Sequence, residues 1–204
     1  MTSLLRQAIF RKSAEKLSQL PAESKAEVAF AGRSNAGKSS ALNALTGRRR
    51  LAHVSKTPGR TRLINFFEVD RAAFLVDLPG YGYAQVSGDM KRQWARLLTG
   101  YLHQRRQIRG LIVVMDARHP MTPLDHQLLD WFTATGKPVH VLLTKADKLS
   151  RSQATAQLRT VQAALRKDYP HCTAQIFSSD TKQGLEEAQQ IVSGWLTTAK
   201  ENGQ

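Results

Sequence analysis

The sequence predicts an α/β fold in three layers: a mostly parallel six-stranded sheet with one antiparallel edge strand, covered by helices on both faces. Apolar strand-like runs alternate with helix-like runs along the chain, a pattern typical of parallel strands joined by crossover helices. The two-residue connection Asp70-Arg71 between two strand-like runs indicates a hairpin, and hence the antiparallel edge. A glycine-rich loop at residues 32–39 lies between the first of these strands and a helix.

The first expected element is an amphipathic helix over residues 3–20, ended by Pro21, because apolar residues recur there at helical spacing: Leu4, Leu5, Ala8, Ile9 and Leu17. Strands are predicted near residues 26–32, 63–69, 72–78, 110–116, 138–143 and 173–178. Further helices are predicted near residues 38–46, 90–106, 122–134, 152–167 and 184–199. We therefore expect an N-terminal helical extension (1–24), one main domain (25–200) and a frayed tail (201–204).

Composition limits the classes of protein that the chain can belong to. Its 204 residues suit one domain, and no apolar run approaches the ~18 residues that span a bilayer, so we expect no membrane insertion. The first 25 residues mix charged and apolar positions and contain no signal-peptide core. The single cysteine, Cys172, excludes an intrachain disulfide framework. We expect a cytoplasmic monomer, in which Cys172 is only a small packing residue.

The charge balance favours a polyanionic partner. The chain has 30 basic and 16 acidic residues, a net charge of +14. Nucleic acid or the ribosome is the first choice and a membrane surface the second, while charge that serves only solubility is the alternative. The basic residues are clustered: Arg48, Arg49 and Arg50; Arg60 and Arg62; Lys91, Arg92 and Arg96; Arg105, Arg106 and Arg109.

Residues 32–39 match G-x-x-x-x-G-K-[ST], a loop that wraps nucleotide phosphates. Gly32 and Gly37 let successive N–H groups point inward at an anion, and the helix that follows adds the positive end of its dipole. Lys38 supplies a charge for the β- and γ-phosphates, and the Ser39 hydroxyl is a magnesium ligand. The predicted phosphate-binding stretch is Gly32, Arg33, Ser34, Asn35, Ala36, Gly37, Lys38, Ser39 and Ser40.

Three later segments also follow predicted strands, at the edge where open α/β sheets bind ligands. In Asp77-Leu78-Pro79-Gly80, the carboxylate of Asp77 can hold Mg²⁺ through water, and the Gly80 N–H can bond a γ-phosphate. In Thr144-Lys145-Ala146-Asp147, the carboxylate of Asp147 can accept two N–H bonds from guanine, which adenine cannot offer. The backbone of Ser178-Ser179-Asp180 can close the base pocket.

With these motifs the chain resembles the EngB family of bacterial ribosome-assembly GTPases, which have the Ras-like G domain of P-loop NTPases. The segments that carry the resemblance are GRSNAGKSS at 32–40, TPGRT at 57–61, DLPGYGYA at 77–84, DARHPMTPLD at 116–125 and TKAD at 144–147. The resemblance implies that Gly59, Arg60 and Thr61 lie at the nucleotide and that Thr61 ligates Mg²⁺. It also implies work on the large ribosomal subunit and its rRNA, and a role in cell division and septation. Thr144 departs from the commoner N-K-x-D, which predicts modest nucleotide affinity.

Hydrolysis is predicted to be slow, because Tyr81 stands where many GTPases place a water-orienting glutamine. We assign catalytic roles to Lys38, Thr61, Gly80 and Asn35. The Asn35 side chain can ligate K⁺ at the phosphates, as in similar GTPases, or it can bond its own loop. A ribosomal group acting in trans is another source of activation. Arg60 and Arg62 fit contacts to RNA phosphate or solvent better than a role as an arginine finger.

Taken together, the sequence predicts a GTP-binding switch with weak, magnesium-dependent GTPase activity. Two alternatives from other classes stay open. A P-loop ATPase or kinase would bind ATP in competition with GTP. An RNA-binding scaffold with a structural nucleotide would bind RNA equally well in the GTP-bound, GDP-bound and empty states.

Overall fold

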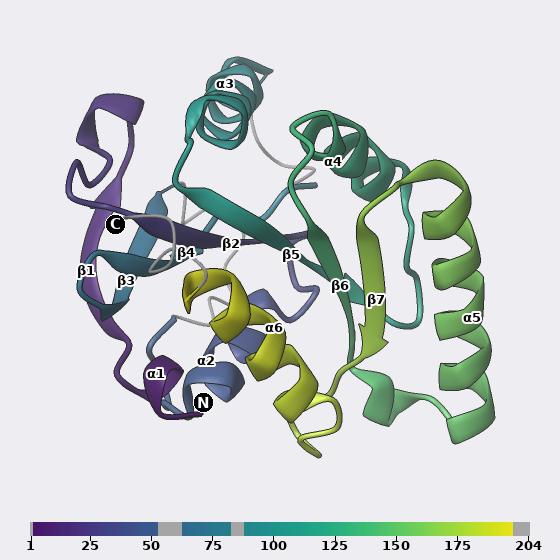
Figure 1. The fold of residues 1–204 in the computed structure, drawn as a ribbon. Coiled ribbons are helices and arrows are strands. Elements are labelled where there is room, and N and C mark those ends of the chain that lie inside the picture. Colours follow the sequence, from purple (N-terminus) through teal and green to yellow (C-terminus); the bar gives the residue numbers. More distant parts are fainter. Residues whose placement is uncertain (1, 53–62, 83–87, 198–204) are drawn as a thin grey trace.

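The computed structural model describes residues 2–52, 63–82 and 88–197, which form a seven-stranded sheet between two layers of helices (Figure 1). The strands are β1 (Ile9–Ala14), β2 (Ala26–Gly32), β3 (Ile64–Asp70), β4 (Ala73–Asp77), β5 (Ile108–Asp116), β6 (Val139–Thr144) and β7 (Cys172–Ile176). The helices are α1 (Thr2–Arg6), α2 (Lys38–Thr46), α3 (Gly88–Gln104), α4 (Pro123–Thr133), α5 (Arg151–Asp168) and α6 (Leu185–Thr197), with short 3₁₀ turns η1 (Leu17–Gln19) and η2 (Ala146–Lys148).

The strand order is β1-β3-β4-β2-β5-β6-β7, and β4, β2, β5, β6 and β7 run parallel. Strand β3 pairs antiparallel with both β1 and β4, and the predicted β3–β4 hairpin turns at Arg71 and Ala72. The predicted fold class, a mostly parallel sheet with antiparallel pairing at one edge and helices on both faces, is confirmed. Every strand and helix predicted beyond residue 25 has a counterpart whose ends agree within two residues.

The N-terminal helix predicted over residues 3–20 is wrong. Only Thr2–Arg6 are helical, and Ile9–Ala14 form β1, so the sheet has seven strands rather than six and β1 lies outside β3 at the edge. The backbone of β1 pairs with β3, and Ser13 adds a 2.7 Å hydrogen bond to Asn65. Helical spacing misleads here because Leu5 and Ala8 are buried while Ile9 is exposed. The tail predicted at 201–204 lies outside the described residues.

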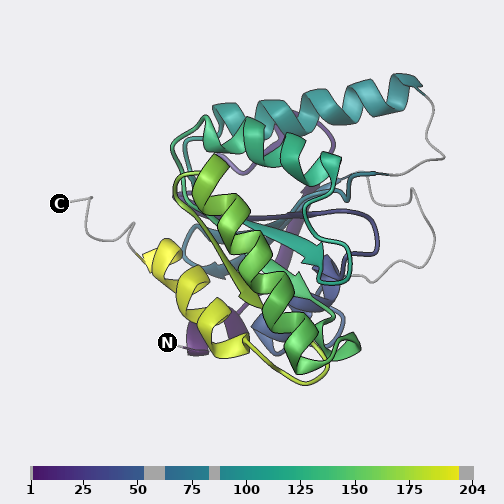
Figure 2. The same cartoon turned by 90° about the vertical axis from the view of Figure 1, so that its right-hand side faces the viewer.

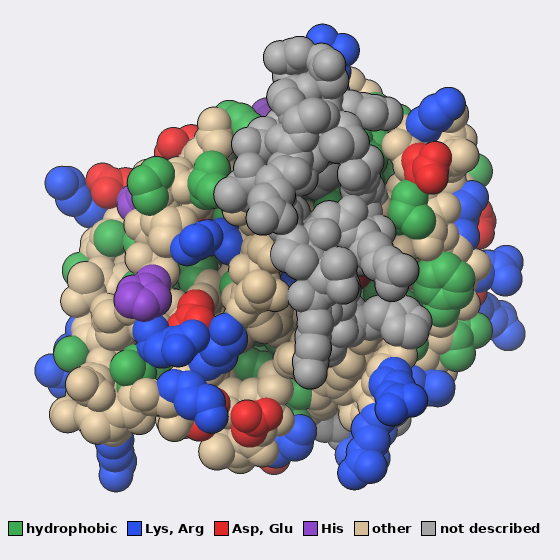
Figure 3. Space-filling view, turned by 180° about the vertical axis from the view of Figure 1, so that it is seen from behind, with side chains coloured by type: hydrophobic (Ala, Val, Ile, Leu, Met, Phe, Trp, Pro, Cys, Tyr) green, Lys and Arg blue, Asp and Glu red, His purple; other side chains and the backbone are tan. Residues whose placement is uncertain are grey.

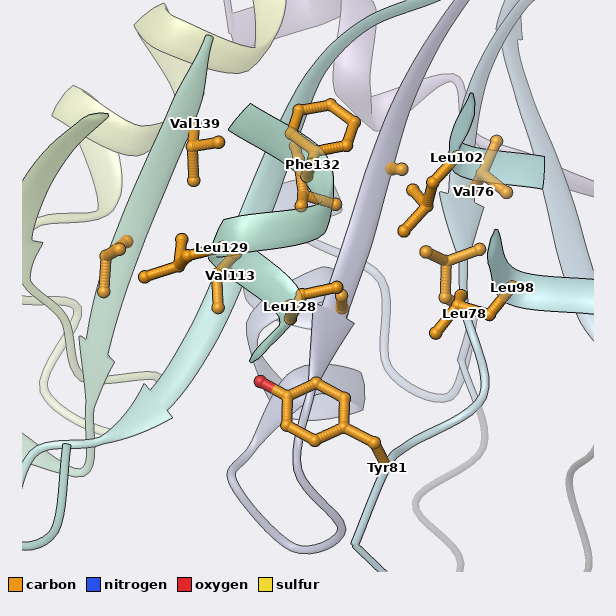
Figure 4. Packing of buried hydrophobic residues seen from close by; sticks show 14 of the residues in the cluster. Val76, Leu78, Tyr81, Leu98, Leu102, Val113, Leu128, Leu129, Phe132 and Val139 are labelled. Carbon is orange, nitrogen blue, oxygen red and sulfur yellow. The ribbon is translucent and has the colours of Figure 1, made fainter. Parts of the chain in front are cut away.

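Each face of the sheet carries its own apolar cluster (Figures 1 and 2). Helices α3, α4 and α5 cover one face; Figure 4 shows Leu128, Leu129 and Phe132 of α4 packed toward Val113 and Val139 of the sheet. Helices α1, α2 and α6 cover the other face with residues such as Leu5, Leu42, Leu45, Val192 and Leu196. No helix in the described ranges is both long and apolar enough to cross a membrane.

Local sequence explains where the helices begin. Helix α4 has Pro123 in its first turn, and the Asp125 carboxylate accepts hydrogen bonds from the N–H of Thr122 at 2.8 Å and from its hydroxyl at 2.7 Å. Helix α5 begins after Ser150, whose hydroxyl accepts a hydrogen bond from the N–H of Gln153. Helix α2 has no such side-chain cap, because the residue before it is Gly37 of the phosphate loop. Its first N–H groups are therefore left for another acceptor.

A buried ion pair anchors α3 to the central strand, at the end of the sheet opposite the phosphate loop. Glu27 of β2 is fully buried; Arg105 donates to its Oε1 from Nη2 at 2.6 Å and from Nε at 2.9 Å. The Tyr101 hydroxyl donates to Oε2 at 2.7 Å, and burial together with this carboxylate raises the pKa of Tyr101 well above its ordinary value. Arg105 also binds the carbonyl of Pro21. One charged pair thus joins β2, α3 and the segment before β2.

Replacing Arg105 with Ala should cost about 3–5 kcal/mol of unfolding free energy, because it leaves the Glu27 carboxylate buried without a cation. Urea denaturation followed by circular dichroism measures the loss. The matched control is Arg106→Ala at the neighbouring exposed position. Losses of equal size in the two variants would show that the buried pair is not the anchor.

Candidate nucleotide-binding site

The predicted site residues that the structure describes meet at one edge of the sheet. Strands β2, β4, β6 and β7 run parallel, so the loops that follow them emerge on the same side. Figure 3 views the molecule from this side and shows Lys and Arg side chains on both sides of the segment drawn in grey. Gly59, Arg60 and Thr61, together with Arg62, lie outside the described residues.

The phosphate loop depends on two glycines for its shape. Strand β2 ends at Gly32, where a Cβ atom would lie 2.7 Å from the carbonyl oxygen of Val114 on β5. Gly37 has a φ of +99° immediately before α2. Residues that carry a Cβ atom adopt this backbone conformation only with strain. Any residue other than glycine would therefore displace the loop at either position. Residues Arg33, Ser34, Asn35 and Ala36 lie between these glycines, and Lys38, Ser39 and Ser40 form the first turn of α2.

Lys38 and Asp77 contact one another directly. The Lys38 ammonium donates a hydrogen bond to Asp77 Oδ1, and both side chains are nearly buried. This contact places the residue predicted to bind phosphate beside the carboxylate predicted to hold magnesium. In the described part of the chain, no group of three or more His, Cys, Asp or Glu side chains could hold a metal. A hydroxyl at Ser39 and a single carboxylate fit Mg²⁺, which takes its other ligands from phosphate oxygens and water.

The loop after β4 lies against the phosphate loop. The N–H of Tyr81 donates to the Gly32 carbonyl at 3.2 Å, and the N–H of Ser34 donates to the Tyr81 carbonyl at 2.9 Å. A Cβ atom at Gly80 would come within 3.4 Å of the Ser34 backbone, so a side chain there would press on the loop. Leu78 and Pro79 are buried behind it. The predicted γ-phosphate contact, Gly80, is thus held beside the phosphate loop.

The side chain of Tyr81 is bonded to α4. Its hydroxyl donates to Asp125 Oδ1 at 2.7 Å, and both residues are buried. Burial, and next the Asp125 carboxylate, raise the pKa of Tyr81 well above its ordinary value. Figure 4 shows the ring at the lower end of the apolar cluster that includes Leu128. The phenol hydroxyl is therefore already bonded within the fold.

The loop after β6 is also tied to the phosphate loop. The buried Thr144 hydroxyl lies within hydrogen-bond distance of the Ala36 carbonyl and, at 3.0 Å, of the Met115 carbonyl. The Lys145 ammonium donates to the Asn35 carbonyl at 2.7 Å. Thr144 lacks the amide of asparagine, but it still connects the base-reading segment to the phosphate loop. In the described residues the Asn35 side chain makes no hydrogen bond to its own loop.

Asp147 is held as an ionised acceptor. The Ser178 hydroxyl donates to its Oδ1 at 2.7 Å, and Lys148 lies 3.0 Å from Oδ2. The Ser178 hydrogen bond, followed by the Lys148 ammonium, lowers the pKa of Asp147. The N–H of Asp180 donates to the Ser178 hydroxyl at 3.3 Å, and Ser179 lies between these two residues. The predicted base-reading carboxylate and the predicted closing loop are therefore in direct contact.

Asp116 and Arg118 belong to this arrangement, although the sequence reasoning assigned them no role. Asp116 ends β5 and lies 3.0 Å from the Lys145 ammonium, while Arg118 binds both of its carboxylate oxygens at 2.9 and 2.6 Å. Burial alone would raise the pKa of Asp116, but these two cations hold it well below its usual range. The signal that could have found Asp116 is its position at the carboxyl end of a parallel strand, the rule that identified Asp77.

Comparison with known proteins points to one family. A family model described as "50S ribosome-binding GTPase" matches residues 27–145. A protein of Nitrosomonas europaea named "Probable GTP-binding protein EngB" is 54% identical over 206 residues, covering 98% of this chain and 93% of its own length. A protein of the same name from Azoarcus sp. strain BH72 is 55% identical over 202 residues, covering 98% of this chain and 97% of its own length.

Solved structures share the fold. A probable GTP-binding protein engB superposes with a TM-score of 0.67 at 19% identity, over 85% of this chain and all of the other. Era, solved in complex with MgGDPNP and nucleotides 1506–1542 of 16S ribosomal RNA, superposes with a TM-score of 0.65 at 22% identity. That match covers 84% of this chain and 56% of Era.

Replacing Tyr81 with Phe should lower the unfolding free energy by about 1.5–3 kcal/mol, because it removes a buried hydrogen bond to a carboxylate. Nucleotide hydrolysis should stay within about twofold of the parent rate, since the hydroxyl is bonded to Asp125. Urea denaturation and a phosphate-release assay measure the two effects. Tyr169→Phe, which removes the 2.8 Å contact to His126, is the matched control. A tenfold fall in hydrolysis without loss of stability would place the hydroxyl at the reacting water.

Proposed function

The chain belongs to the EngB family of P-loop GTPases, and from this membership we propose that it is a GTP-gated assembly factor for the large ribosomal subunit, with slow, magnesium-dependent hydrolysis. The single observation that carries the proposal is the connected arrangement of the phosphate loop, Asp77 and Asp147 at one edge of the sheet. The family likeness extends the proposal to cell division and septation, and to a cytoplasmic monomer.

Guanine recognition is assigned to Asp147. Its carboxylate is ionised and fixed by Ser178, so it can accept the N1–H and N2–H of guanine in one plane. Adenine has an acceptor at N1 and no N2 amine, so it would leave these polar groups unpaired. This chemistry disfavours the alternative of a P-loop ATPase. Ser179 and Asp180 would cover the other edge of the base.

The phosphates and the metal are assigned to the opposite half of the site. Gly32–Ser40 would surround the phosphates with N–H groups, and Ser39, Thr61 and Asp77, the last through water, would hold Mg²⁺. When bound, the metal neutralises charge on the β- and γ-phosphates. Lys38 would turn from Asp77 toward the phosphates, which leaves the carboxylate to face the waters of the metal. Gly59, Arg60 and Thr61 complete the proposed contacts, with Gly80 bonding the γ-phosphate.

Slow hydrolysis follows from the engagement of Tyr81 with Asp125, and K⁺ is the activator that we propose. The side chain of Asn35 makes no hydrogen bond within its loop in the described residues, so its carbonyl oxygen can accept a cation at the phosphates. Such a cation would stabilise the negative charge that develops in the transition state.

Exchanging Na⁺ for K⁺ at constant ionic strength should raise the hydrolysis rate at least roughly tenfold, the scale of one charge-stabilising contact. Phosphate release under single-turnover conditions measures it. Asn35→Ala should abolish the difference between the two salts, while its backbone carbonyl can still bind Lys145. Equal rates of the parent protein in Na⁺ and K⁺ would contradict the role of K⁺ and leave activation to the ribosomal partner.

The ribosomal part of the proposal is supported by the description of the matching family model and by the net charge of +14. Basic residues on the face that carries the nucleotide loops would contact rRNA phosphates (Figure 3). Contacts that depend on loops beside the γ-phosphate would form in one nucleotide state and not in the other.

Co-sedimentation with isolated ribosomal subunits tests this function. The protein should pellet with the large subunit in a non-hydrolysable GTP analogue, much less in GDP, and less at high salt than at low salt. Lys38→Ala, which removes the phosphate-binding ammonium, is the control that should lose the dependence on nucleotide. Equal pelleting in all states would favour the RNA-binding scaffold with a structural nucleotide. No pelleting would rule out a direct ribosomal partner.

A further inference from the structure

The outer strand β1 exposes large apolar side chains that nothing in the described structure covers. Phe10 is 57% exposed and Ile9 is 50% exposed, and Leu124 on α4 is the other exposed large apolar residue in the described ranges. Phe67 contacts Phe10 edge-on, with ring centroids 6.0 Å apart. This contact orients the Phe10 ring and leaves most of it open to solvent. An ordered and exposed aromatic ring is a feature that ligands recognise.

Exposed arginines lie on the chain segments next to this ring. Arg11 follows Phe10, and its side chain is 55% exposed, with only a 3.7 Å contact to Glu68. Arg6 is the last residue of α1. Arg48 donates from Nε to the Arg6 carbonyl at 3.0 Å, so the segment that follows α2 lies beside the end of α1. Phe10 lies on the side of the sheet that α1 and α2 cover, because its partner Phe67 packs in their cluster. We call Arg6, Phe10, Arg11 and Arg48 the β1 surface.

The segment that carries α1 and β1 is mainly basic. Residues 1–20 contain Arg6, Arg11, Lys12 and Lys16 and one acidic residue, Glu15. The neighbouring strand β3 adds Glu68 and Asp70. Figure 3 shows Lys and Arg side chains beside apolar and some acidic ones along the right-hand edge of that view, on the side of the molecule where Figure 1 places β1. The chemistry that complements this surface is therefore a polyanion with planar apolar groups.

Addition of a protein strand to β1 fits the structure less well. The pairing of β1 with β3 shifts register between Phe10 and Lys12, so a bulge at Arg11 interrupts the regular ladder. Bulges and charged side chains are the features that keep edge strands from pairing with another chain. Single-stranded RNA complements this surface better, because its bases stack on aromatic rings and its phosphates bind arginine.

We propose that the β1 surface binds single-stranded RNA, with a base stacked on Phe10 and phosphates bound by Arg6, Arg11 and Arg48. The proposal deepens the proposed function by naming an RNA contact outside the nucleotide loops. Strands β3 and β4 separate β1 from β2, which carries the phosphate loop. RNA binding at the β1 surface should therefore be independent of the bound nucleotide. The β1 surface would bind RNA in every nucleotide state, in addition to the contacts made by the nucleotide loops in one state.

Fluorescence anisotropy with a fluorescein-labelled, 12-nucleotide single-stranded RNA of mixed sequence tests the proposal, using the full chain at several KCl concentrations. Phe10→Ala should weaken binding about tenfold, the effect of losing one stacked base, and Phe10→Trp should retain binding. Arg11→Gln should reduce the slope of log affinity against log salt by about 0.7, the value for one phosphate contact on a single strand. GTP analogue and GDP should give equal affinities.

Two matched controls lie away from the β1 surface. Leu124→Ala removes an exposed apolar side chain from α4, and Arg159→Gln removes a charge from an exposed position on α5, which packs beside β7 at the opposite edge of the sheet. Both should leave RNA affinity unchanged. Equal losses in the controls and in Phe10→Ala, or no binding of the RNA by the parent protein at low salt, would overturn the proposal.

Pelleting of the same variants with large ribosomal subunits separates this proposal from the proposed function. If Phe10→Ala weakens binding of the RNA while the parent protein does not pellet, the RNA site stands and the ribosomal function fails. If Phe10→Ala lowers pelleting but leaves affinity for the RNA unchanged, the β1 surface contacts a protein component and the RNA assignment fails.

Discussion

The phosphate loop can turn its N–H groups toward an anion only if its carbonyl oxygens are bound on the other side. Three carbonyls of this loop are bound by residues that come from other strand ends. Gly32 accepts from the Tyr81 N–H, Asn35 accepts from Lys145, and the Ala36 carbonyl lies at the Thr144 hydroxyl. The loops after β4 and β6 therefore hold the phosphate loop in shape as well as supplying their own chemistry. This constraint explains why short motifs far apart in the sequence act as one site.

The charges of the site obey a second constraint, because four of its described cations already have a carboxylate partner. Lys38 is bonded to Asp77, Lys145 and Arg118 share Asp116, and Lys148 lies beside Asp147. In a chain with a net charge of +14, these four cations of the site share three carboxylates, so most of their charge is paired locally. A phosphate that takes Lys38 leaves Asp77 without its cation, so binding of the nucleotide and binding of a divalent metal should favour one another.

The sequence predicted the central sheet and the nucleotide loops because both depend on local patterns: apolar runs, glycines, and polar residues after strands. It failed at residues 9–14, where apolar residues fit a helical period and only pairing with β3 decides for a strand. The contacts that fix the site were also beyond sequence reasoning. Thr144 and Ala36 are 108 residues apart, and no spacing rule predicts that the hydroxyl of one meets the carbonyl of the other. Gly59, Arg60 and Thr61 stay predictions from resemblance.

Tyr81 joins the phosphate loop to α4. Its backbone binds the phosphate loop at Gly32 and Ser34, and its hydroxyl binds Asp125, whose carboxylate also accepts hydrogen bonds from Thr122. Moving the side chain toward a reacting water would leave a buried carboxylate without this donor, at a cost of about 1–3 kcal/mol. A glutamine in the same place would not have a hydroxyl bonded to Asp125 that must stay where it is. If intrinsic hydrolysis is slow, as proposed, a cation or a partner would supply the missing stabilisation, and the lifetime of the GTP-bound state would depend on that encounter.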